Sequence, residues 1–113
     1  MSEFVDYLHE VFAEFGETTA RKMFAGYGIY RDGVMFGLVA DDQLYLKVDN
    51  TNRKDFEALG LDAFEYNEQG KLMKMSYYLS PEDIYDDPKL AAQWAHKSWD
   101  IALKNARKKK KSA

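Results

Sequence analysis

The sequence contains no cysteine and no apolar run long enough to cross a bilayer. Without cysteine there can be no disulfide framework, no thiolate metal site and no cysteine nucleophile. A membrane-spanning helix needs about 20 apolar residues, and the start, Met-Ser-Glu-Phe-Val-Asp, lacks the basic and apolar segments of a signal peptide. These absences predict a soluble, cytoplasmic protein without a membrane partner.

Acidic residues are missing from the C-terminal end of the chain, because none follows Asp100. The chain has 16 basic and 19 acidic residues, and six of the basic ones lie in this end: Lys104, Arg107, Lys108, Lys109, Lys110 and Lys111. The part before them carries 10 basic and 19 acidic residues, a net charge of −9. Such a body repels phosphate-rich polymers, and only the basic end could attract them.

The 113 residues are enough for one domain, and a hydrophobic fraction of 46% is enough for a packed core. Periodicity and turn residues predict the order α-β-β-β-α-β-β-α. The expected elements are a helix ending before Gly16, strands near 22–31, 34–40 and 43–48, a helix ending before Gly60, strands over 63–67 and 71–79, and helix starts at Ser80-Pro81 and Asp87-Pro88. Because hairpins pair antiparallel strands, we expect a two-layer α+β domain whose five-stranded antiparallel sheet has helices on one face.

Turns at Asp32-Gly33 and Asp41-Asp42 set the expected register of the first three strands. Two-residue turns place Tyr30 opposite Met35 and Gly28 opposite Gly37. Alternation then assigns to the core face Phe24, Gly26, Gly28, Tyr30, Met35, Gly37, Val39, Leu44, Leu46 and Val48. The glycines of this face would let a helix lie close to the sheet.

The opposite face of the same strands is too apolar for a solvated surface. Exposed apolar surface usually marks an interaction site. The candidate protein-interaction face consists of Tyr27, Ile29, Phe36, Leu38, Tyr45 and Lys47. We expect it to meet a second copy of the chain, forming a homodimer, or another protein.

Motifs that could carry chemistry have simpler structural interpretations. Gly26-Tyr27-Gly28 lies inside a strand, so it is not a phosphate-binding loop followed by a helix. His9 and His96 lie on separate helices without further ligands at metal-site spacing. The aspartate pairs at 41–42 and 86–87 suit turns and caps. We therefore predict no enzyme, no catalytic residue, no cofactor, no metal and no small-molecule substrate.

The basic end, residues 104–113, is expected to follow a domain of residues 1–103. Its six cations could bind nucleic acid weakly, without sequence preference and with strong salt dependence. The alternative is a solvated helix end whose lysines complement the helix dipole.

Several segments together resemble the N-terminal domain of the TfoX/Sxy family. They are Lys22-Met23-Phe24-Ala25-Gly26-Tyr27-Gly28-Ile29-Tyr30, Gly33-Val34-Met35-Phe36, Tyr45-Leu46-Lys47-Val48, Phe64-Glu65-Tyr66, Ser76-Tyr77-Tyr78, Pro81 and the helix from Trp94 to Ala106. The resemblance covers nearly the whole chain. One departure is Ala25, where the family usually has a second glycine.

The resemblance implies a two-layer α+β fold like that of secretion chaperones, which are commonly dimeric, and a bacterial regulatory role. Full-length members promote the expression of competence genes, acting with the cyclic-AMP receptor protein, and carry a second, helical domain. We expect this chain to be the N-terminal domain alone, because it ends in lysines where that second domain would begin. It is then a non-enzymatic regulatory or protein-interaction domain. The alternatives are a nucleic-acid-associated transcriptional regulator that uses the basic end, or an undescribed enzyme.

Overall fold

The structure is a computed structural model. It describes residues 3–23 and 26–112, apart from the side chains of 68, 72–74 and 108–112. The elements, in chain order, are α1 (Glu3–Val11), β1 (Thr19–Met23), β2 (Gly26–Arg31), β3 (Val34–Ala40), β4 (Gln43–Lys47), α2 (Arg53–Glu57), β5 (Ala63–Glu68), β6 (Lys71–Leu79), the 3-10 helix η1 (Glu82–Asp86) and α3 (Pro88–Ser112). The predicted places of Phe24 and Ala25 lie outside the described residues.

The α+β class and the antiparallel sheet are confirmed, but the sheet has six strands and not five, in the order β1-β2-β3-β4-β6-β5. The first strand was expected to begin near residue 22, after a short link over 18–22, but Thr19–Met23 forms β1, which pairs with β2 from Thr19–Tyr30 to Met23–Gly26. This strand is hard to predict because Arg21 and Lys22 are exposed at the edge of the sheet. Exposed cations at an edge discourage further strand pairing.

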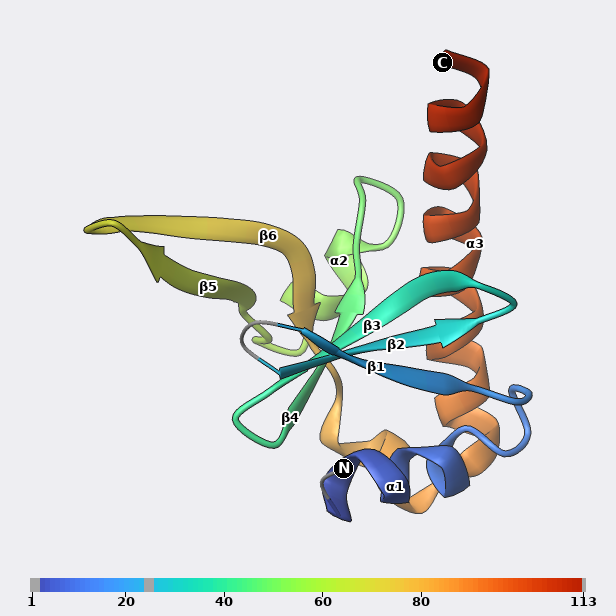
Figure 1. The fold of residues 1–113 in the computed structure, drawn as a ribbon. Helices are drawn as coiled ribbons and strands as arrows, with labels where there is room; N and C mark the ends of the chain where they lie inside the picture. Colours follow the sequence, from blue (N-terminus) through green and yellow to red (C-terminus); the bar gives the residue numbers. More distant parts are fainter. Residues whose placement is uncertain (1–2, 24–25, 113) are drawn as a thin grey trace.

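The predicted turns at Asp32-Gly33 and Asp41-Asp42 are present, the β5–β6 hairpin has a turn at Gln69-Gly70, and each of the three has a positive φ at both central residues. The φ angles are 51° and 77° at Asp32-Gly33, 52° and 56° at Asp41-Asp42, and 51° and 82° at Gln69-Gly70. Two consecutive positive φ angles define the type I′ turn, which matches the twist of the flanking strands. Figure 1 shows these hairpins following one another through the sheet.

Of these three turns, only the one at Asp41-Asp42 has no glycine at its second central residue. This difference leads to a prediction about stability. Asp42 has φ 56°, a left-handed conformation that costs a residue with a Cβ about 1 kcal/mol or more. Replacing Asp42 with glycine removes that cost, although the unfolded chain gains entropy. We expect Asp42→Gly to raise the free energy of unfolding in urea by about 0.5 kcal/mol. Asp42→Ala, the control, should lower it; equal values for the two variants would contradict this explanation.

A β-bulge in β3 decides which face of the sheet each strand buries. Tyr30 lies opposite Met35, as predicted, but Ile29 lies opposite Gly37, so β3 has one extra residue at Phe36. Gly28 is therefore opposite Leu38 and not Gly37. An extra residue exchanges the two faces beyond it. The predicted face assignment was consequently wrong for β2 and for the first part of β3.

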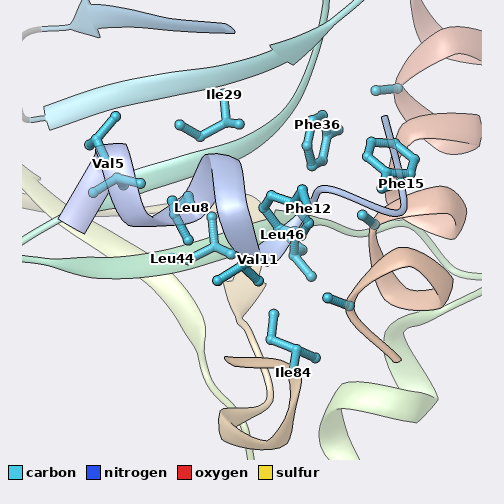
Figure 2. Close-up of a cluster of buried hydrophobic side chains, with 14 of the residues drawn as sticks. Val5, Leu8, Val11, Phe12, Phe15, Ile29, Phe36, Leu44, Leu46 and Ile84 are labelled. Carbon is cyan, nitrogen blue, oxygen red and sulfur yellow. The ribbon is translucent and has the colours of Figure 1, made fainter. Parts of the chain in front are cut away.

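The hydrophobic core lies between one face of the sheet and the layer formed by α1, η1 and α3. Ile29 and Phe36 point into it from the sheet and meet Leu8 and Phe12 from the N-terminal helical segment (Figure 2). The ring of Phe36 lies 5.5 Å from that of Phe12 and 5.1 Å from that of Phe15, both in edge-to-face geometry. This aromatic cluster joins the N-terminal segment to the centre of the sheet.

Close helix packing depends on small residues of α3 and not on the strand glycines. The helix buries a stripe of Ala91, Ala95, Ser98 and Ala102, and Ser98 donates a hydrogen bond of 2.8 Å to the carbonyl of Lys47. As predicted, Asp87 begins this helix, accepting a hydrogen bond from the Leu90 amide. The structure thus contradicts the prediction of glycines lying beneath a helix.

Each of the three strand glycines has a neighbour within the sheet. A methyl group at Gly26 would overlap the carbonyl oxygen of Val39, and one at Gly37 would lie 3.3 Å from Leu44. One at Gly28 would lie about 3 Å from Met23, Tyr30 and Met35. Of the three glycines, only Gly26 has another backbone segment in close contact, as expected for a glycine inside a strand. The contacting segment is the neighbouring strand β3 and not a helix.

Candidate protein-interaction face

Half of the predicted interaction residues lie on the side of the helices. Ile29 and Phe36 have exposed fractions of 1% and 0%. Tyr27, which lies opposite Val39, packs against the same core. The assignment of these three residues to an exposed face is corrected by the bulge in β3, which turns them toward α1 and α3.

The other three predicted residues, Leu38, Tyr45 and Lys47, lie on the face away from the helices. We call this the outer face. It consists of Met23, Met35, Leu38, Ala40, Tyr45, Lys47, Phe64, Tyr66, Met75 and Tyr77. Leu38, Ala40, Phe64 and Tyr77 are buried at its centre, and the remaining side chains are partly exposed. The outer face thus presents partly exposed methionine and tyrosine side chains around a small buried apolar centre.

The β5–β6 hairpin contributes Phe64, Tyr66, Met75 and Tyr77, which the sequence did not assign to this face, and the bulge in β3 adds Met35, which was predicted on the core face. Between the pairs Ala63–Tyr78 and Glu65–Lys74 the register shifts, and the hairpin bends away from the rest of the sheet (Figure 1). The ring of Phe64 contacts that of Tyr45 edge to face at 4.9 Å. The outer face is therefore lined by two separate hairpins, and its extent depends on the bend.

Tyr77 and Tyr78 are neighbours in β6 and lie on opposite faces of the sheet. Tyr77 belongs to the outer cluster, whereas the Tyr78 ring contacts Phe56 on the helix side at 5.9 Å. Tyr77 lies opposite Lys47 in the sheet, and the Lys47 ammonium lies 5.1 Å from the centre of its ring. The same ammonium donates a 2.6 Å hydrogen bond to the hydroxyl of Ser76. Lys47 thus covers the edge of the apolar centre while remaining charged.

Burial, assisted by the nearby phenol of Tyr30, raises the pKa of Tyr77 to about 12 from an ordinary value of 10.0. Between these two values the unfolded chain loses the phenol proton and the folded chain keeps it, so the free energy of unfolding falls as the pH rises. Between pH 9 and pH 11, the free energy of unfolding should therefore fall by roughly 1 kcal/mol less in Tyr77→Phe than in the wild type. Urea unfolding at both pH values measures this. Equal losses in the two proteins would show that Tyr77 is not the group responsible.

The candidate nucleic-acid residues lie along α3, which continues without interruption past the predicted boundary at 103 and 104. Lys104 and Arg107 are exposed; the side chains of Lys108, Lys109, Lys110 and Lys111 lie outside the description. Figure 1 shows the last turns of α3 standing away from the sheet. The basic end thus extends the last helix of the domain.

The two histidines have local partners. His9 Nδ1 is 3.0 Å from the Thr18 hydroxyl, and His96 Nδ1 is 3.6 Å from an Asp100 carboxylate oxygen. Within the described ranges, no three His, Cys, Asp or Glu residues are grouped as a metal site would require. In the same part of the chain, no helix has the length and apolar content to cross a membrane.

The fold and the outer face define a small α+β domain with a helical layer on one side of its sheet and an apolar concentration on the other. The chain belongs to the family described as the TfoX N-terminal domain, whose model matches residues 10–102. The match ends just before the basic residues that begin at Lys104.

A curated relative is the DNA transformation protein TfoX1 of Aliivibrio fischeri (strain ATCC 700601 / ES114). It is 30% identical over 78 residues, which are 66% of this chain and 37% of the relative. The chain therefore spans little more than a third of the length of that protein.

Proposed function

We propose that this domain is a non-enzymatic, regulatory module that binds a protein through the outer face. The observation that carries the proposal is the composition of that face, where partly exposed Met35, Tyr45, Tyr66 and Met75 surround a buried apolar centre. Contiguous apolar surface of this kind is a feature of interaction sites, and methionine adapts its shape to a partner.

The regulatory part of the proposal is supported by family membership and by the name of the relative, which refers to DNA transformation. Association with another protein, including a second copy of the chain, needs no catalytic group. It uses shape and apolar area, which the outer face supplies.

Light scattering on the full chain at high concentration, together with pull-downs, tests the proposal. The variants Met35→Glu and Tyr45→Glu place a charge on the outer face, and Leu59→Glu, in the turn after α2, is the matched control because Leu59 is 57% exposed. We expect the first two to abolish self-association or the recovery of a partner, with thermal stability measured in parallel. A monomer that retains no partner in any form would contradict the proposal.

A second candidate is weak nucleic-acid binding through the C-terminal half of α3. The observation that favours it is the continuous helix to Ser112, which carries the exposed cations Lys104 and Arg107. Mobility shifts with DNA across a salt series would compare the full chain with a chain ending at Leu103 and with a full-length variant in which Lys108–Lys111 are glutamine. Binding that weakens with salt and disappears in both altered chains supports this function; no binding by the full chain excludes it.

A further inference from the structure

A pocket of about 320 Å³ lies where the C-terminal half of α3 passes the edge of the outer face. Four strands, the turn between β2 and β3, and α3 all contribute to it. The lining residues are Tyr30, Gly33, Val34, Met35, Lys47, Tyr77, Ala102, Asn105 and Ala106. Its volume is at the lower end of the range for small-molecule sites, which are typically formed where several elements meet.

The chemistry of the lining is divided between an apolar part and a polar part. Val34, Met35, Ala102 and Ala106 supply aliphatic surface. Lys47, Tyr30, Tyr77 and Asn105 supply an ammonium group, two phenols and a carboxamide. No carboxylate is among the described lining residues, although the body of the chain is acidic. The polar part therefore favours a hydrogen-bond acceptor with negative charge.

The position of Lys47 is fixed by its neighbours. Its ammonium donates to Ser76 at 2.6 Å and lies over the Tyr77 ring at 5.1 Å. Its backbone carbonyl accepts hydrogen bonds from Ser98 at 2.8 Å and from Asn52 at 3.2 Å. The Tyr77 hydroxyl, like that of any tyrosine, is protonated at neutral pH and can donate. The cation is thus placed in advance of any ligand.

We propose that this pocket binds a small carboxylate with an apolar body. The Lys47 ammonium and the tyrosine hydroxyls receive the carboxylate, and the aliphatic surface of β3 and α3 receives the body. A phosphate fits less well, because the described lining offers one lysine and no arginine fork. The pocket shares Met35, Lys47 and Tyr77 with the outer face, but binding of a small carboxylate needs no protein partner and is measured without one.

NMR titration of the full chain, labelled with nitrogen-15, tests the site with hexanoate, hexanol and inorganic phosphate. Hexanoate should give saturable shifts at the amides of Met35, Lys47, Tyr77 and Asn105, with affinity at least tenfold above those of hexanol and phosphate. Tighter binding of phosphate would overturn the assignment to a carboxylate. Absence of saturable shifts at these amides would overturn the site itself.

Two variants examine the roles of the polar groups. Lys47→Met retains the aliphatic stem and removes the charge, and Tyr77→Phe retains the ring and removes the hydroxyl. Each should weaken hexanoate binding, the first at least tenfold, while Lys54→Met at an exposed lysine of α2 leaves it unchanged. The amide spectrum without ligand reports whether each variant is folded. Unchanged affinity in folded Lys47→Met would contradict the proposal.

Discussion

Gly26→Ala is expected to destabilise this domain more than an alanine substitution at either of the other two strand glycines, Gly28 and Gly37. A Cβ at this position would overlap the Val39 carbonyl oxygen and lie 2.9 Å from its carbon. Both obstructing atoms belong to the backbone of β3, so no rotamer change can relieve the contact. The strands would have to separate, and we expect a loss of about 3 kcal/mol or more in the free energy of unfolding.

Gly28→Ala is the matched control, because Gly28 lies two residues further along the same strand. A Cβ there would meet the sulfur atoms of Met23 and Met35 at 2.9 and 3.1 Å and the Tyr30 ring at 3.0 Å. Methionine side chains can shift, so the loss should be no more than about 1 kcal/mol. Urea unfolding of both variants gives the comparison. A smaller loss for Gly26→Ala than for Gly28→Ala would contradict the close approach of β2 and β3.

Phe36→Ala is the second substitution with a large expected effect. Phe36 has no exposed surface and contacts the rings of Phe12 and Phe15, so its removal leaves a cavity between the sheet and the N-terminal segment (Figure 2). Loss of a buried phenylalanine costs about 3–5 kcal/mol. This is a large share of the stability of a small domain, which is typically about 5–15 kcal/mol.

Leu59→Ala provides the comparison for Phe36→Ala, since 57% of Leu59 is exposed. A surface substitution of this kind should change the free energy of unfolding by about 0.5 kcal/mol or less. If Phe36 lay on an exposed face, as strict alternation predicts, the two substitutions would have similar effects. That outcome would contradict the bulge and the arrangement of the two faces.

The turns and helix starts of this domain could be predicted because each depends on a few adjacent residues. Asp32-Gly33 forms the expected turn, and Asp87-Pro88 begins the last helix. The edge strand β1 was largely missed because Thr19–Met23 contains two cations and little apolar alternation. An edge strand of this kind has a weaker pattern than a central strand.

The bulge in β3 could not be found from alternation, because both sets of alternate residues in this strand are apolar. Met35 and Leu38 now lie on one face, while Phe36 and Val39 lie on the other. The sequence did contain a usable signal in β2, where Tyr27 and Ile29 alternate with glycines. Burial of the larger side chains removes more apolar area from water, and this comparison favours the observed arrangement.

The outer face could be predicted only in part, for a related reason. Leu38, Tyr45 and Lys47 follow from the register of β3 and β4. The two-residue turn at Asp41-Asp42 implies the pairs Gly37–Leu46 and Val39–Leu44, and both are observed. The contributions of Phe64 and Met75 depend on the bend in the β5–β6 hairpin. A long-range bend of this kind arises from tertiary packing and leaves no short sequence motif.

Site-specific photo-crosslinking tests the central claim, that the outer face is the interaction surface, most directly. A photoreactive phenylalanine replaces Tyr45 on the outer face in one protein and Tyr7 on α1 in another; Tyr7 is 40% exposed and lies on the helical side. Light is applied to the full chain in its native cells. We expect the protein with the photoreactive group at position 45 to form an adduct with a second copy or with another protein, and the protein with the group at position 7 to form none. Adding Met35→Glu should abolish the adduct from position 45. Adducts from position 7 with none from position 45 would contradict it.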